Sequence, residues 1–133
     1  ESEEFLKKLN DKGVDLIRLI SPTTTEERIA KILASSSGYL YYISLKGVTG
    51  SELKISNELE NRVSEIKKQT KLPVVVGFGI KDAKTARKMS LCSDGVVVGS
   101  KLVDEIGKFE PKKENILNQN LTSIISELKH GIS

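Results

Sequence analysis

The sequence has very few of the residues that form covalent or metal cross-links. Its 133 residues include one cysteine, Cys92, and one histidine, His130. A single cysteine excludes an intramolecular disulfide, and one Cys with one His cannot make a typical zinc site. A Ser-His-Asp triad would have to rest on His130, at the end of the chain's last helical pattern, which disfavours it. The sparse cysteine usage fits a cytoplasmic location.

Long apolar runs and runs of like charge are also missing. No stretch of about 18 apolar residues occurs, and the first residues, Glu1 to Glu4, are not those of a secretory signal, so we expect no membrane partner. The 21 basic and 18 acidic residues are spread along the chain, without a block of like charges or a basic-aromatic ladder. We therefore expect no nucleic-acid partner either.

What remains is the composition of an ordinary globular protein. Hydrophobic residues make up 38% and charged residues 29% of the chain, and the length suits a single domain, residues 1–133. Apolar runs with strand character occur near residues 14–20, 39–45, 74–78 and 95–99, separated by segments of helical periodicity. This alternation predicts an α/β fold with four parallel strands and flanking helices. The third and fourth runs are continuous valines, which is typical of strands buried on both faces.

Two helix starts carry recognisable caps. Thr24, with Glu27 three residues later, matches a capping box for a helix over 24–34, and Asp82 precedes another helix. Further helices are expected over 2–9, from about residue 55 to 69, from Ser100, and through the last apolar stripe of Leu117 to Leu128. Four βα units are half of the eight in a closed (β/α)8 barrel, so the sheet is either open or half of a barrel.

Glycine-bearing turns follow three of the four expected strands: Gly47–Gly50, Gly77–Ile80 and Gly99–Ser100. The carboxyl ends of parallel strands lie at one rim, where glycines and helix N-termini let backbone N–H groups approach an anion. The three turns together predict a phosphate site, although each alone could serve only a tight turn. None of them fits the GxGxxG or GxxxxGK[ST] pattern, which disfavours dinucleotide and Walker-type sites.

These stretches, read together, resemble the tryptophan synthase alpha subunit family. The matching segments are Gly38–Ser44, Gly47–Gly50, Pro73–Ile80 and Asp94–Ser100, with Ile20–Thr24 as a further likeness. Their order and spacing agree with the C-terminal half of that family. The resemblance implies that this chain is the C-terminal half of a TIM (β/α)8 barrel.

The resemblance also implies an activity. Members of the family cleave indole-3-glycerol phosphate by a retro-aldol step to indole and glyceraldehyde 3-phosphate, in tryptophan biosynthesis. Indole then passes to a beta subunit that carries pyridoxal phosphate, so no cofactor or metal is expected in this chain itself. By resemblance Tyr41 is the catalytic tyrosine, and the other positions carried over are phosphate-binding (Gly50, Gly79, Gly99, Ser100), the closing loop (Thr49) and the walls of the indole pocket (Leu19, Phe78).

The family's two catalytic carboxylates are expected in the other half of the barrel, and neither motif occurs here. We therefore expect this chain alone to be inactive, and a half-barrel with two open sheet edges to self-associate. Two alternatives stay open. The chain could be a non-catalytic phosphate-binding half-barrel module, or part of another phosphate-binding (β/α)8 enzyme.

Overall fold

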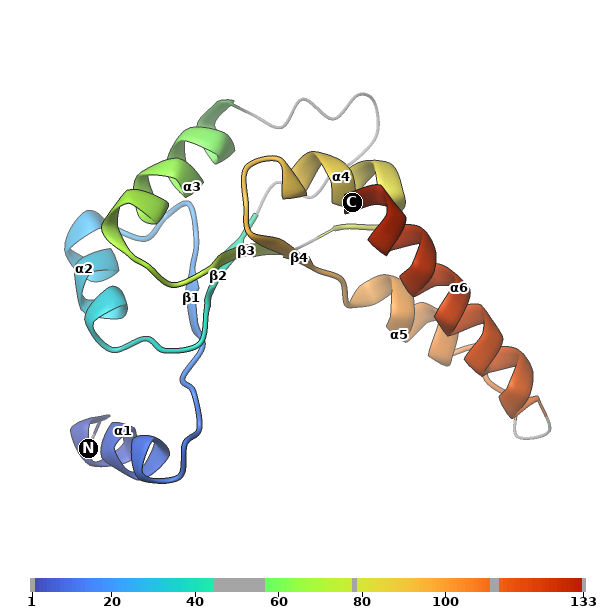
Figure 1. The fold of residues 1–133 in the computed structure, drawn as a ribbon, viewed down its shortest axis with the longest axis horizontal. Helices are drawn as coiled ribbons and strands as arrows, with labels where there is room; N and C mark the ends of the chain where they lie inside the picture. Colours follow the sequence, from blue (N-terminus) through green and yellow to red (C-terminus); the bar gives the residue numbers. More distant parts are fainter. Residues whose placement is uncertain (1, 45–56, 78, 111–112, 133) are drawn as a thin grey trace.

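The computed structural model describes residues 2–44, 57–77, 79–110 and 113–132. Six helices and four strands follow one another in these ranges (Figure 1). None of the described helices is both long and apolar enough to cross a membrane. The elements are α1 (Ser2–Asp11), β1 (Arg18–Ile20), α2 (Glu26–Ala34), β2 (Leu40–Ile43), α3 (Asn57–Gln69), β3 (Val74–Gly77), α4 (Ala83–Ser90), β4 (Gly95–Val97), α5 (Ser100–Ile106) and α6 (Glu114–Ile132).

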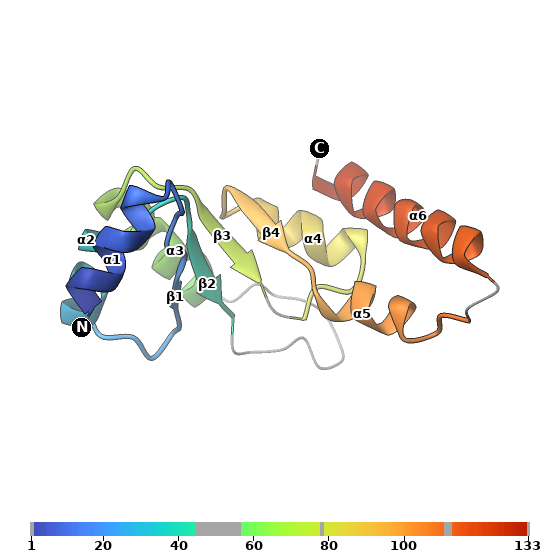
Figure 2. The same cartoon turned by 90° about the horizontal axis from the view of Figure 1, so that it is seen from below.

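The four strands form one parallel sheet in the order β1-β2-β3-β4, which confirms the predicted α/β architecture. The sheet has helices on its convex side, with α2 and α3 toward one end and α4 packed against α6 toward the other (Figures 1 and 2). In Figure 1 α1 stands apart from this layer, below β1. Two strands, β1 and β4, are the edges of the sheet.

The two faces of the sheet are in different environments. On the helix-covered face, Ile20, Leu40, Tyr42, Val74 and Val76 are buried. They belong to one hydrophobic core with the inward-facing helix residues, which include Ile29, Val63, Ile66, Ala86 and Met89. The opposite face carries Leu19, Tyr41, Ile43, Val75 and Val97, none of which is fully buried.

The expectation that the third and fourth strands are buried on both faces is therefore wrong for this chain. Val74 and Val76 are buried, but Val75 between them is only partly buried, and so are the three residues of β4. The reason is that the helices pack on only one face of the sheet, so side chains that point to the other face, such as that of Val75, stay partly exposed.

Strand β1 is shorter than the run 14–20 predicts. The backbone N–H of Leu16 donates to Ser37 Oγ at 2.8 Å, and the N–H of Ser37 donates to the carbonyl of Leu16 at 3.2 Å. These contacts tie residues before β1 to the turn that leads into β2. Leu16 and its neighbours are satisfied there instead of in the strand ladder, which begins at Arg18.

One predicted cap is correct and the other is wrong by one residue. Asp82 caps α4, where its carboxylate accepts from the Thr85 N–H at 2.7 Å. Helix α2 is capped by Thr25, whose hydroxyl accepts from the Arg28 N–H, and not by Thr24. Thr24 is used elsewhere, because its hydroxyl accepts the Ser21 N–H at 3.0 Å in the turn after β1.

Asp94 joins β4 to β3 and α3. Its carboxylate accepts from Lys67 Nζ at 2.6 Å and from the Val74 N–H at 2.8 Å. These two hydrogen bonds hold the pKa of Asp94 below its usual range, and the one from Lys67 has the larger effect. The hydrogen bond from the Thr85 N–H likewise lowers the pKa of Asp82.

A carboxyl whose pKa is lower in the folded state stabilises the fold above its unfolded pKa, about 3.9, and this contribution disappears as the pH falls through the folded pKa. We expect the urea midpoint to decrease between about pH 5 and pH 2, and Asp94→Asn to lose less than the parent over this range. Urea unfolding at several pH values measures this. Asp11→Asn, which removes the same charge at the end of α1, should retain the full decrease, and an Asp94→Asn curve parallel to the parent's would contradict the role of Asp94.

Candidate functional site

The carboxyl ends of the strands meet at one rim of the sheet. Ile43, Gly77 and Val97 form one row across β2, β3 and β4. The N–H of Ser44 donates to the Gly77 carbonyl at 3.1 Å, which extends the row beyond the end of β2. Since the segments after these strands all leave from this rim, it is the place where the predicted site residues can converge.

The structure places five of the eight predicted site residues at or near this rim. Leu19 and Tyr41 lie on β1 and β2, Gly79 follows β3, and Gly99 with Ser100 connects β4 to α5. The other three, Thr49, Gly50 and Phe78, lie outside the described residues. The pairing of β3 with β4 brings the glycine-bearing turns after these two strands to the same edge.

Tyr41 and Leu19 share the face of the sheet that has no helix layer. They are register partners in neighbouring strands, and Tyr41 is in turn opposite Val75. Tyr41 is half-buried, and 55% of Leu19 is exposed. They lie on the opposite face of the sheet from the buried Leu40, Tyr42 and Ile20, because successive side chains of a strand alternate between its two faces.

Because Gly77 has no side chain, it leaves room for the Tyr41 ring. A Cβ atom at position 77 would lie 2.6 Å from Tyr41 Cζ and would collide with the hydroxyl oxygen. The ring therefore crosses β3 beyond its register partner Val75, and the hydroxyl lies at the strand's carboxyl end. Gly77 was not among the predicted site residues, and the only signal for it in the sequence is a glycine directly after a run of valines.

The two glycines among the phosphate-binding candidates after β3 and β4 have different backbone roles. Gly79 has a φ of +72°, a conformation that favours glycine. Gly99 is the N-cap of α5, its carbonyl accepts from the Leu102 and Val103 N–H groups, and a Cβ there would meet no atom within 4 Å. Ser100, the first residue of α5, is exposed, and the first N–H groups of a helix have no partner within it. The open surface and these donors are suited to an anion.

The turn after β1 is held by hydroxyl groups and by an arginine. Ser21 Oγ lies 3.0 Å from Thr23 Oγ1 and 3.1 Å from Thr24 Oγ1. Arg62 of α3 donates to the Thr24 carbonyl at 2.8 Å and pairs with Glu26, which raises the pKa of the guanidinium. This turn, with Leu19 and Ile43, lines a surface cavity of about 300 Å³. Arg62 thus positions one wall of the rim, a role that its sequence context does not show.

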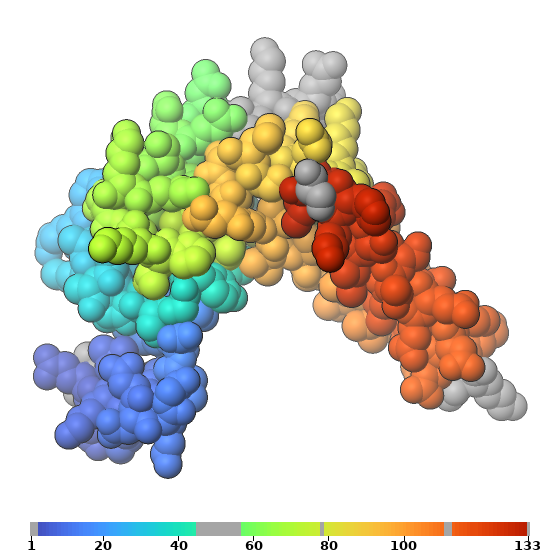
Figure 3. All heavy atoms as spheres, viewed as in Figure 1, coloured from blue at the N-terminus to red at the C-terminus, as the bar shows by residue number. Residues whose placement is uncertain are grey.

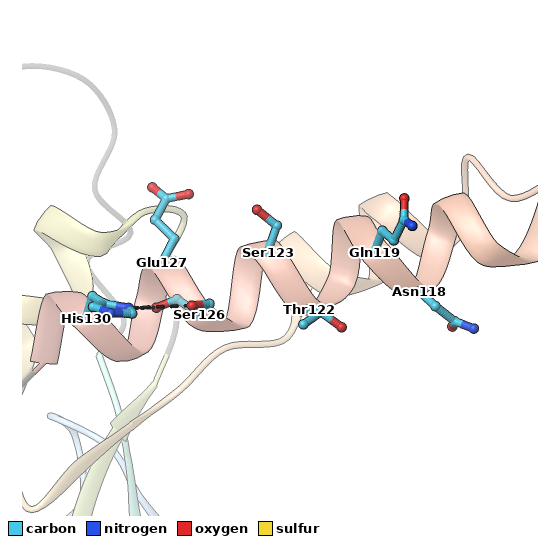
Figure 4. A pocket seen from close by; sticks show the side chains of 7 residues that line it. All are labelled: Asn118, Gln119, Thr122, Ser123, Ser126, Glu127 and His130. Carbon is cyan, nitrogen blue, oxygen red and sulfur yellow. Dashed lines mark hydrogen bonds between the residues drawn. The ribbon is translucent and has the colours of Figure 1, made fainter.

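A second surface hollow lies on α6, and no residue of the sheet rim lines it. It measures about 740 Å³ and is lined by seven polar side chains of α6 alone, between Asn118 and His130 (Figure 4). His130 Nδ1 lies 2.7 Å from the Ser126 carbonyl oxygen, one turn earlier in the helix. Since an Nδ1 facing a carbonyl oxygen must donate, His130 is used within its own helix. Among the described residues no group of three or more His, Cys, Asp or Glu side chains could hold a metal ion.

The family of the chain follows from its match to a model of known proteins. The family model described as tryptophan synthase alpha chain matches residues 1–133. The chain belongs to the tryptophan synthase alpha chain family. The resemblance drawn from the glycine-bearing turns and the tyrosine strand is thereby confirmed.

Individual relatives agree with this assignment. The chain is 41% identical over 132 residues to the tryptophan synthase alpha chain of Aromatoleum aromaticum, and 99% of this chain and 48% of the relative are covered. It is 47% identical over 106 residues to that of a Janthinobacterium species, with 80% and 40% covered. The chain thus spans about half the length of these relatives, and it matches the C-terminal half.

Solved structures show the same relation. The crystal structure of tryptophan synthase subunit alpha from Legionella pneumophila superposes with a TM-score of 0.80 at 36% identity, and 99% of this chain and 47% of that one are covered. A crystal structure of tryptophan synthase from M. tuberculosis superposes with a TM-score of 0.78 at 26% identity, covering 100% and 46%. These tryptophan synthase alpha structures are TIM barrels, so the four-stranded sheet corresponds to about half of a barrel.

Proposed function

We propose that this chain is the phosphate-binding half of a tryptophan synthase alpha-type lyase. Such an enzyme cleaves indole-3-glycerol phosphate to indole and glyceraldehyde 3-phosphate. The observation that carries the proposal is the shared rim, where Tyr41 and the turns at Gly79 and Gly99 lie at the carboxyl ends of neighbouring strands in a chain of this family.

The anionic end of the substrate is assigned to the turns after β3 and β4. Backbone N–H groups at Gly79, Gly99 and Ser100 supply donors, and the Ser100 hydroxyl adds one more. Gly50 is assigned to the same group, with Thr49 in the loop that closes over the substrate, although both lie outside the described residues. The residues assigned to the phosphate are neutral, so binding depends on oriented dipoles.

The indole end is assigned to the uncovered face of the sheet. Leu19 and Tyr41, as register partners on that face, offer an apolar surface and a phenol hydroxyl, and Phe78 is assigned as a further wall. Cleavage requires protonation of the indole ring and removal of a hydroxyl proton, which needs an acid and a base. Tyr41 can orient one of these groups, but no described carboxylate lies at the carboxyl end of β2, β3 or β4.

We therefore propose that both catalytic carboxylates come from the other half of the barrel and that this chain alone is inactive. The full-length parent is expected to deliver indole to a beta subunit, which holds the pyridoxal phosphate, so this chain needs no cofactor. A cytoplasmic location follows from that biosynthetic role. The isolated chain is also proposed to self-associate.

Binding of glycerol 3-phosphate to the isolated chain tests the phosphate site. We expect saturable binding, monitored by amide chemical shifts at Gly79, Gly99 and Ser100, with no turnover of indole-3-glycerol phosphate. Ser100→Asp should weaken binding at least about tenfold, or ~1.4 kcal/mol, because it places a negative charge among the donors. Ser126→Asp, on the exposed face of α6, is the matched control and should bind like the parent.

Reconstitution tests the lyase assignment separately. The N-terminal half of the Legionella pneumophila alpha subunit, mixed with this chain, should restore indole release, and Tyr41→Phe should reduce it. If phosphate binds but two folded halves release no indole, the non-catalytic module becomes the better interpretation. If the folded chain shows no phosphate binding, the site itself is misassigned.

A further inference from the structure

The turn after β1 is closed by its own hydrogen bonds. The N–H of Thr24 donates to the Ser21 carbonyl at 3.0 Å, and the N–H of Ser21 donates to Thr24 Oγ1 at 3.0 Å. Pro22 is the second residue of this turn, a position that the φ angle of proline suits. Residues 21–24 therefore form a compact unit, and contacts with other elements determine where this unit lies.

Arg62 of α3 makes such a contact. Its Nη2 donates to the Thr24 carbonyl oxygen at 2.8 Å, and its Nη1 pairs with Glu26 at the start of α2. Glu65, one turn later in α3, lies 3.4 Å from the same Nη1. In the space-filling view the atoms of α3 lie directly against those of α2 (Figure 3). One planar guanidinium thus joins α3 both to the turn and to the helix that follows the turn, a geometry that the single nitrogen of a lysine does not reproduce.

The Arg62 guanidinium is partly shielded from water, and the space around it is not filled by apolar side chains. The Arg62 side chain is 20% exposed, and hydrogen bonds in such places contribute more than those at the open surface. A cavity of about 300 Å³ lies between the turn and α3, and Pro22, Tyr42 and Arg62 are among the residues that line it. The turn is therefore held to α3 by hydrogen bonding more than by close apolar packing.

The same turn also borders the proposed substrate pocket. The rim cavity is lined by hydroxyl residues of the turn and by apolar side chains of the strands, among them Leu19, Ser21, Thr23, Thr24 and Ile43. Leu19 is the residue assigned to the wall of the indole pocket. A displaced turn would change the pocket at this end, whereas the turns after β3 and β4 lie on the other side of β2 and would keep their positions.

We propose that Arg62 is a positioning residue for the indole end of the substrate pocket. It acts through the Thr24 carbonyl, by holding the turn after β1 beside Leu19, and it does not touch the substrate. The inference rests on the proposed lyase function, because that function assigns the indole end to Leu19. Loss of Arg62 should weaken binding of the indole-bearing substrate and leave phosphate recognition and the chemical step unchanged.

Steady-state kinetics of the barrel reconstituted with the N-terminal half of the Legionella pneumophila subunit test this role. Arg62→Met should raise KM for indole-3-glycerol phosphate about five- to tenfold and leave kcat within about twofold, since the turn contributes to binding alone. Arg62→Lys keeps a donor and should recover part of the loss. Arg87→Met, the same substitution at an exposed arginine of α4, is the matched control and should match the parent.

Two measurements on the chain by itself show where the substitution acts. Glycerol 3-phosphate should bind to Arg62→Met with the Kd of the parent. Hydrogen exchange of the Ser21 N–H, which Thr24 Oγ1 accepts, should be at least about fivefold faster in Arg62→Met, because the turn has lost its link to α3. Circular dichroism checks folding, and if Arg62→Met is unfolded the same comparisons are made with Arg62→Lys.

In an active barrel, a parent-like KM for a folded Arg62 variant would overturn this inference and leave the proposed function intact. So would unchanged exchange at Ser21, a decrease in kcat at constant KM, or a loss of glycerol 3-phosphate affinity as large as the rise in KM. A parent barrel that releases no indole would contradict the proposed function, and this inference with it. The two failures are distinguished because the first is seen only when the parent barrel is active.

Discussion

Replacing Gly77 by alanine is expected to reduce the free energy of unfolding by about 1–3 kcal/mol, the usual range for inserting a methyl group into a filled space. The new Cβ would lie 2.6 Å from Tyr41 Cζ, so the ring must leave its position over β3. The same change displaces the Tyr41 hydroxyl from the carboxyl end of the strand. In a reconstituted barrel we therefore expect Gly77→Ala to reduce indole release at least as much as Tyr41→Phe.

A double-mutant cycle separates this collision from other effects of the methyl group. With Tyr41→Val, which removes the ring, adding Gly77→Ala should cost much less than it does in the parent. Gly95→Ala is the matched control, since it is a strand glycine of the same face whose Cβ would come no closer than 3.4 Å to Val75. Urea unfolding measures all four variants. Equal costs for Gly77→Ala with and without the Tyr41 ring would show that the two residues do not interact.

Gly131→Ala is expected to destabilise the chain by about 1–2 kcal/mol, although alanine is the better helix former by about 1 kcal/mol. Gly131 lies in the last turn of α6, where this helix packs against α4. An added Cβ would lie 2.6 Å from the carbonyl oxygen of Ala83 and 3.0 Å from its Cα. Both are backbone atoms at the start of α4, so the contact cannot be relieved by a side-chain rotation.

The sign of the change in stability distinguishes packing from helix propensity. Asn118→Ala, at an exposed position of the same helix, should raise the urea midpoint slightly, because no neighbour opposes the more favourable residue. If Gly131→Ala also raises it, then α6 does not approach α4 as closely as described.

Local patterns along the chain were sufficient for much of the architecture. The alternation of apolar runs predicted four parallel strands, the family resemblance added that they are half of a barrel, and Asp82 was correctly predicted to cap α4. Such features depend on residues a few positions apart, so a sequence contains them directly. The motif resemblance led to the correct family for the same reason, since each glycine-bearing turn is a short and continuous segment.

Features that depend on residues far apart in the sequence were predicted less well. Thr24 is a reasonable cap by sequence, but its hydroxyl is engaged by Ser21 and its carbonyl by Arg62, 38 positions later, so Thr25 caps the helix instead. The first strand is shortened by a contact between Leu16 and Ser37. The contact between Leu16 and Ser37 is a tertiary hydrogen bond, whereas the Thr24 hydroxyl is taken by a local turn that the Arg62 contact supports from another element.

By itself, the sequence determined the order of the elements, the parallel sheet, the family and the strand on which Tyr41 lies. Only the tertiary structure decided which face of the sheet the helices cover, that Gly77 makes room for the Tyr41 ring, and that Arg62 holds the turn after β1. Periodicity shows that a residue alternates with its neighbours, but it contains no information about which partner approaches from another strand. That information exists only once β2 and β3 are paired, because the collision that position 77 must avoid is with a residue from a different strand.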